Sequence, residues 1–265
     1  MNGYTKPGLL LLMISVVIAF CGTLAQYSFY SSVRPTDLQG HYSSFLFNLW
    51  PLTIIGILAG LLYYLGAIFI LLGRKEFGEK HRKYIFYSII IFIAVVVLTF
   101  VFTRSISSTA FSWITSGQPT NTFTDTADFF RTQILSSLID SLIFAIPYGL
   151  IWVFALYNLE NKKGQIILLA AFVTMILIPI VTFIGSFTVV NDWITYGTLD
   201  NLSNASTSSF MRSDLFSISQ WTGPTGIILL LSQFLNCILL FVALYIPYNR
   251  IITRELKPDL STTQA

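Results

Sequence analysis

Six long apolar runs constrain the fold of this chain more than any other feature of its sequence. A helix needs about 20 mostly apolar residues to cross the hydrocarbon core of a bilayer. Only 10% of the 265 residues are charged and 54% are hydrophobic, whereas soluble domains carry roughly 25% charged residues. We therefore predict an all-α polytopic integral membrane protein, a single domain over residues 1–265 with six transmembrane helices. The approximate spans are residues 8–30, 49–73, 84–102, 134–157, 165–190 and 225–248.

The placement of lysine and arginine predicts the orientation of the chain in the membrane. Loops on the cytoplasmic side carry an excess of these residues. With six spans, eleven of the fifteen lysines and arginines lie on the same side as both termini. We therefore expect a multi-pass cell-membrane protein with cytoplasmic N- and C-termini. The eleven residues are Lys6, Arg74, Lys75, Lys80, Arg82, Lys83, Lys162, Lys163, Arg250, Arg254 and Lys257.

Each of the three outer connections contains an aspartate near a serine or threonine, just before apolar residues: Asp37, Asp128 and Asp214. Such residues favour helix N-termini, because their side-chain oxygens accept the unpaired amide hydrogens of the first turn. From each aspartate to the next cytoplasmic basic residue the chain is longer than one crossing requires. We therefore expect short interfacial helices that turn into the membrane, at Trp50-Pro51 in the first case. The six spans then form three hairpins of similar plan.

The densest charge in the chain is the basic cluster in the connection after the second span. Its simplest role is to anchor that connection at the cytoplasmic surface. The alternative is recognition of an anionic lipid headgroup or of a protein partner. The residues concerned are Arg74, Lys75, Lys80, Arg82 and Lys83.

Gly56 and Gly60 form a GxxxG motif in the second span. Small residues at this spacing allow two helix backbones to approach closely. We interpret the motif as ordinary packing between helices of the same chain. The alternative is a homodimer contact, so a homo-oligomer through membrane helices stays open beside a separate protein partner.

Two N-glycosylation sequons, at Asn201 and Asn204, fall in the last outer connection. Their position agrees with the predicted topology, because the modification occurs on the outer side in organisms that perform it. Such triplets also arise by chance in loops rich in serine and asparagine. The chain is therefore a possible glycoprotein.

Several membrane chemistries lack the residues that they require. His41 and His81 lie in opposite connections, and no predicted span contains a histidine, so an intramembrane haem, copper or histidine-ligated centre is excluded. Cys21 and Cys237 are too few for a cysteine-rich metal site. The phosphate-binding motif GxxxxGK[ST] is absent. We expect no cofactor, no metal, no catalytic residues and no nucleic-acid partner; the lipid bilayer is the expected surrounding.

Asp140 is the only ionisable side chain well inside a predicted span. A carboxylate there costs free energy unless it has a partner, a water-filled cavity or a raised pKa. If the last three spans are neighbours, Asp140 could accept hydrogen bonds from Thr182, Gln233 or Asn236. The other polar residues expected at this depth are Ser136, Ser137, Ser141, Ser186 and Ser232.

Three interpretations of this intramembrane layer remain open. Asp140 could be a hydrogen-bonded packing anchor, could belong to a proton, cation or solute site, or could pair with an arginine or a partner subunit. We favour the anchor. The function that follows is a non-enzymatic subunit or accessory component of a membrane complex. The alternative is a small transporter or channel with a polar site around Asp140 and Asn236, and a membrane-embedded enzyme acting on lipid is a more remote third reading.

Overall fold

The computed structural model describes residues 3–32, 38–115, 123–195, 221 and 223–256. Within these residues the protein is entirely helical, and six of the helices are long and apolar enough to cross a membrane. The predicted all-α fold class with six membrane-crossing helices is therefore confirmed. The helices are α1 (Thr5–Ser32), α2 (Leu38–Leu72), α3 (Gly78–Thr115), α4 (Phe123–Leu156), α5 (Lys162–Thr195) and α8 (Gly223–Ile252), with the short 3-10 helix η2 (Gly73–Lys75) after α2.

Every helix is longer than the apolar run from which it was predicted. The run predicted over residues 84–102, for example, lies within a helix of 38 residues. An apolar run marks only the part that crosses hydrocarbon, whereas the helix continues while its backbone hydrogen bonds are favourable. The segments predicted as interfacial helices before the second and fourth spans are helical but continuous with α2 and α4. Pro51 lies inside α2 rather than at a break, as membrane helices tolerate.

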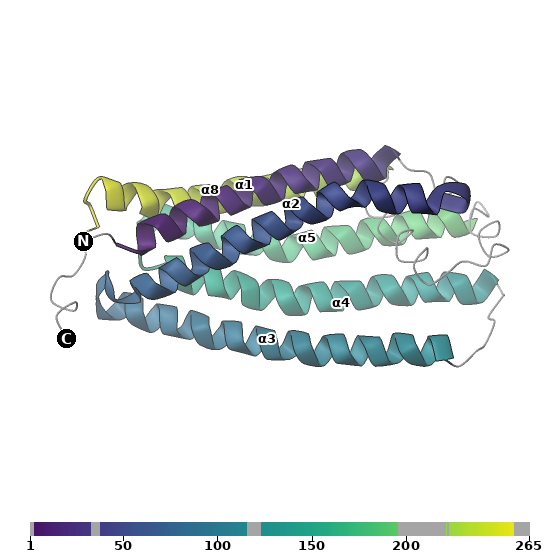
Figure 1. Cartoon of the computed structure of the whole chain (residues 1–265), viewed down its shortest axis with the longest axis horizontal. Coiled ribbons are helices and arrows are strands. Elements are labelled where there is room, and N and C mark those ends of the chain that lie inside the picture. The colour runs from purple at the N-terminus through teal and green to yellow at the C-terminus, as the bar shows by residue number, and fades with distance from the viewer. Residues whose placement is uncertain (1–2, 33–37, 116–122, 196–220, 222, 257–265) are drawn as a thin grey trace.

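The helices pack as three hairpins joined side by side. α1 packs on α2, α3 on α4, and α5 on α8, which are the three pairs joined by the predicted outer connections. α4 also packs on α5, and α1 on α8, so the order of neighbours is α2, α1, α8, α5, α4, α3. Figure 1 shows that α2 and α3, the two helices at the ends of this series, diverge away from the termini.

In the described part of each hairpin, a side-chain hydrogen bond joins the two helices. The Ser15 hydroxyl of α1 donates to the Ala59 carbonyl oxygen of α2 at 2.9 Å. The Ser88 hydroxyl of α3 lies 3.1 Å from the Ile151 carbonyl oxygen of α4. The third contact, between α5 and α8, belongs to the polar region described below. Such bonds between membrane helices are each worth about 0.6 kcal/mol on average, so packing must supply most of the stability.

The apolar core lies in the half of the bundle nearest the termini, where all six helices converge. Leu9 and Leu12 of α1, Ile85 of α3 and Leu156 of α4 are each no more than 1% exposed. Many other apolar side chains face outward, among them Ile166 at 68% exposure. Apolar side chains on the outside of a six-span bundle meet lipid tails, so this surface agrees with a membrane location.

The closest backbone approach between α1 and α2 uses glycines other than the predicted GxxxG pair. A methyl group added at Gly66 would lie 2.7 Å from the Leu12 Cγ atom and 2.9 Å from the Gly8 carbonyl oxygen. At Gly56 and Gly60 such a group would meet nothing within 4 Å. The interpretation of Gly56 and Gly60 as an intramolecular packing motif is therefore wrong, because among the described residues no atom of another helix lies close to either position.

The N-terminus of α1 is fixed to the connection between α2 and α3. The Glu76 carboxylate accepts hydrogen bonds from the backbone amides of Tyr4 and Thr5, at 2.5 and 3.3 Å. These are free donors of a first helical turn, and a negative charge there is also favoured by the helix dipole. Thr5 is fully buried and packs directly on Gly73, where a side chain would not fit. The start of α1 is thereby joined to the connection that links the α1–α2 hairpin to the α3–α4 hairpin.

The glycine contact between α1 and α2 predicts a difference between two substitutions in one helix. We expect Gly66→Leu to force the helices apart and to lower the free energy of unfolding by about 1–3 kcal/mol, the usual range for overpacking. Gly60→Leu is the matched control and should leave stability nearly unchanged, because its site is open. Thermal unfolding of the purified variants in detergent measures both. Equal unfolding midpoints for the two variants would contradict the packing described here.

Candidate functional site

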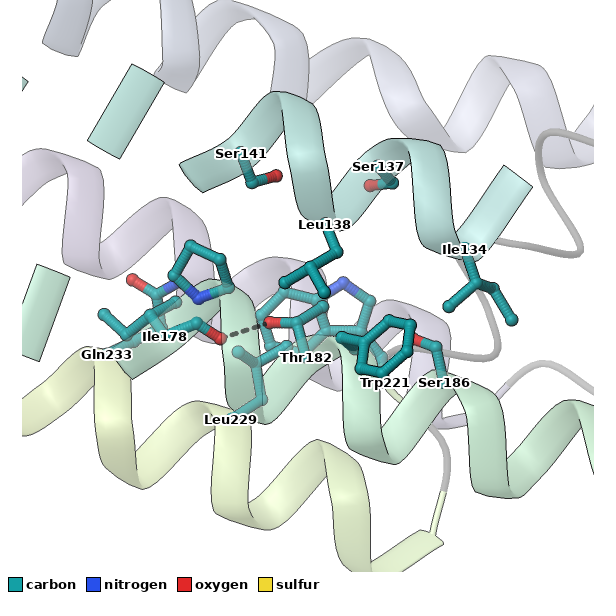
Figure 2. A pocket seen from close by; sticks show the side chains of 12 residues that line it. Ile134, Ser137, Leu138, Ser141, Ile178, Thr182, Ser186, Trp221, Leu229 and Gln233 are labelled. Atoms are coloured by element: carbon teal, nitrogen blue, oxygen red, sulfur yellow. Dashed lines mark hydrogen bonds between the residues drawn. The ribbon is translucent and has the colours of Figure 1, made fainter. Parts of the chain in front are cut away.

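A cavity of about 320 Å³ lies between α4, α5 and α8, in the half of the bundle away from the termini. It is lined by the first half and middle of α4, the middle and second half of α5 and the first half of α8, together with Trp221. Figure 2 shows these side chains converging from the three helices. The apolar part of the lining consists of Ile134, Leu138, Ile178, Pro179, Phe183, Trp221 and Leu229.

Five polar side chains complete the lining. Ser137 and Ser141 are four residues apart, so they share one face of α4, and Figure 2 shows both on the cavity side. The Thr182 hydroxyl donates to the Ile178 carbonyl oxygen of its own helix at 2.9 Å. Ser186 is only 1% exposed, and its hydroxyl has no hydrogen-bond partner among the described residues. Gln233 brings an amide from α8.

The structure brings together some of the residues predicted as an intramembrane layer and separates others. Ser137, Thr182 and Gln233 line the cavity, whereas Asp140 and Asn236 are not part of its lining. Asp140 is partly exposed on α4 and makes no hydrogen bond or ion pair with any residue that the structure describes. Its role as a packing anchor or as part of a site stays a prediction.

Asn236 makes its polar contact at a different level of the bundle. Its side-chain oxygen lies 2.8 Å from the Thr174 hydroxyl of α5, which is also 2.8 Å from the Ala171 carbonyl oxygen. The single hydroxyl proton is therefore shared between two acceptors. This bond joins α5 to α8 and is the third interhelical bond of the hairpins. Thr174 was not predicted to take part, because a threonine inside an apolar run gives no sign of the helix that it faces.

Glu160, in the short connection between α4 and α5, is a buried carboxyl group that no sequence pattern predicts. It is 6% exposed, and neither carboxylate oxygen has a hydrogen-bond partner among the described residues. The carboxylate lies against Gly164, where there is no room for a side chain. Burial raises the pKa of Glu160 to about 8, and the nearby Arg250 charge partly opposes this rise.

Arg250 holds the end of α8 beside this connection. Its guanidinium donates to the Leu159 carbonyl oxygen and lies 3.5 Å from the Glu255 carboxylate. Leu159 itself is fully buried. The arginine was predicted only as one of the charges that set orientation, but the structure shows that it also joins the C-terminal end of α8 to the connection between α4 and α5.

The remaining predicted sites are found at the surface or outside the described residues. All five members of the basic cluster are exposed, and Lys83 forms an exposed ion pair with Glu79 at 3.2 Å. Exposed pairs of this kind contribute little stability, so the cluster stays a predicted surface anchor or lipid contact. Asn201 and Asn204 lie outside the described residues, so no structural observation supports glycosylation there. Among the residues that are described, no three histidine, cysteine, aspartate or glutamate side chains gather as a metal site would require.

The buried carboxyl group predicts a pH dependence of stability. Because the pKa of Glu160 in the folded protein, about 8, exceeds its ordinary value of 4.5, the folded state holds the proton more tightly. The stability that this provides is complete below pH 4.5 and is lost as the pH rises through about 8. We expect Glu160→Gln to flatten the fall in unfolding midpoint between about pH 5 and about pH 9.

Thermal unfolding of the wild type and of Glu160→Gln across that range checks this prediction. Glu79→Gln serves as the control, since Glu79 is exposed at the start of α3 and should leave the pH profile as it is. A profile for Glu160→Gln that follows the wild type throughout would show that the buried carboxyl group does not set the dependence.

Comparison with known proteins identifies the family. Residues 76–255, about two thirds of the chain, match the family described as Sec-independent protein translocase protein (TatC). The matched part begins in the connection after η2 and contains all of α3, α4, α5 and α8, and therefore every residue that lines the cavity. No match was found among curated proteins or among solved structures. TatC proteins span the membrane six times, as this protein does, and the chain belongs to the TatC family.

Proposed function

We propose that this protein is a non-enzymatic subunit of a Sec-independent protein translocase, held in the cell membrane with both termini in the cytoplasm. The observation that carries the proposal is the TatC match, because it extends over four of the six membrane helices. The distribution of lysine and arginine supports the orientation. The family match does not favour the alternative of a small solute transporter.

The packing of the helices is compatible with a role as one component of a larger assembly. None of the described helices lies between α2 and α3 at the open side of the bundle. Both helices expose apolar residues there and elsewhere, including Ile57 at 58% and Phe86 at 59%. Lipid or the membrane helices of other translocase subunits can cover such surfaces, because both offer apolar contacts. The proposed partners are therefore further subunits of the same translocase, bound within the membrane.

Removal of the gene tests the proposed function in the host. We expect export of a Sec-independent reporter protein to fall to background when this gene and any other of its family are deleted. Expression of this chain alone should restore export. Fractionation of cells and immunoblotting of the reporter measure the exported share.

A Sec-dependent reporter in the same strains provides the control, and its export should stay unchanged. Normal export of the Sec-independent reporter in the deletion strain would overturn the proposal. An equal loss of both reporters would also overturn it, because that result indicates general damage to the membrane rather than the loss of one translocase.

A further inference from the structure

The cavity between α4, α5 and α8 has polar walls in a part of the molecule that lipid surrounds. Ser137, Ser141 and Gln233 line it, and none of them forms a hydrogen bond with a residue that the structure describes. Ser186 lies six residues inside the end of the α5 span, about 9 Å along the helix. Its hydroxyl is buried and also lacks a partner. Four side chains with unmet hydrogen-bonding capacity therefore face one space.

These groups need hydrogen-bond partners more in a membrane than at the surface of a soluble protein, where water is available. A hydroxyl or amide that is removed from water without a hydrogen bond is destabilising, and lipid tails can neither donate nor accept one. Pro179, which lines the cavity from α5, leaves one more polar group without a partner. It lacks an amide hydrogen, so the carbonyl oxygen one turn earlier in α5 has no helical donor. An acyl chain in the cavity would leave all of these groups unsatisfied.

The volume and the lining both suit water. A cavity of about 320 Å³ is much larger than the roughly 10–15 Å³ that a cavity needs to hold one water molecule. Polar cavities with several available partners hold water, whereas purely apolar cavities stay dry. Within the described part of the chain the lining carries hydroxyl and amide groups but no charged side chain, so it offers hydrogen bonds without selecting an ion of either sign. A serine hydroxyl can also turn between staggered positions to reach a water molecule.

We propose that the cavity between α4, α5 and α8 is a water-filled recess, which hydrates the membrane-embedded side chains of Ser137, Ser141, Ser186 and Gln233. The proposal does not rest on the translocase function. Its consequence is that these side chains hydrogen-bond with water, although lipid surrounds the helices. The recess shares Ser137, Thr182 and Gln233 with the intramembrane layer expected from the sequence, whereas Asp140 lies outside its lining.

Cysteine accessibility tests the proposal. Cys21 and Cys237 are first replaced by alanine, and single cysteines are then introduced as Ser137→Cys and Ser186→Cys. The purified variants are placed in lipid vesicles and exposed briefly to silver ions, which react with thiolates. A thiol ionises in water but not in hydrocarbon. After denaturation, the thiols that remain are labelled with a maleimide and counted by mass spectrometry.

Matched controls come from the lipid-facing side of the same helices. Ile139→Cys on α4 and Ile184→Cys on α5 lie two residues from the test positions and replace side chains that are 48% and 59% exposed. We expect silver to block the cavity thiols at least about ten times faster than the control thiols, because only a hydrated thiol ionises readily. Cavity thiols that react as slowly as the controls would overturn the proposal. If Ser186→Cys does not fold, Ser141→Cys takes its place in the same comparison.

Discussion

Within a bilayer, backbone amide and carbonyl groups have no water to bond, so each must find its partner inside the chain. This constraint determines the architecture. It favours a continuous helix for each of the six apolar spans, and it leaves the association of those helices to packing and to a few side-chain hydrogen bonds. Ser15, Ser88 and Thr174 each donate one such bond, and each bond closes one hairpin. Lipid tails are as apolar as the helices, so burial of apolar surface does not drive the helices together. Close van der Waals contacts, such as that between Gly8 and Gly66, supply most of the remaining stability.

The two ends of the bundle differ as a result. At the terminal end all six helices converge on a packed core, and polar side chains fix the connections there: Glu76 holds the start of α1, and Arg250 holds the connection between α4 and α5. At the other end α2 and α3 diverge, and the cavity opens between α4, α5 and α8. A closely packed half and a polar, more open half therefore lie in one molecule, and the TatC match covers the helices that form the cavity.

Hydropathy was sufficient to predict the spans, because the cost of placing polar groups in hydrocarbon acts on every residue of a run. Depth along a helix could be estimated only in part. Ser137, Thr182 and Gln233, which the sequence puts at one level, line one cavity. Asn236, which the sequence puts at the same level, contacts Thr174 at another level of the bundle. The facing side of a helix could not be predicted in this way. Gly56 and Gly60 have the spacing of a contact motif but face away from the other helices. Glu160 resembles any loop acid in the sequence, and only the fold shows that α5 and α8 bury it.

This chain crosses the membrane six times as three hairpins, and the positions of its two ends test this topology most directly. Reporter fusions that are active on only one side of the membrane, placed separately at the N- and C-termini, give the required measurement. Six crossings predict that both termini report the same side, and the distribution of lysine and arginine predicts that this side is the cytoplasm. Termini on opposite sides would mean an odd number of crossings and would contradict the account.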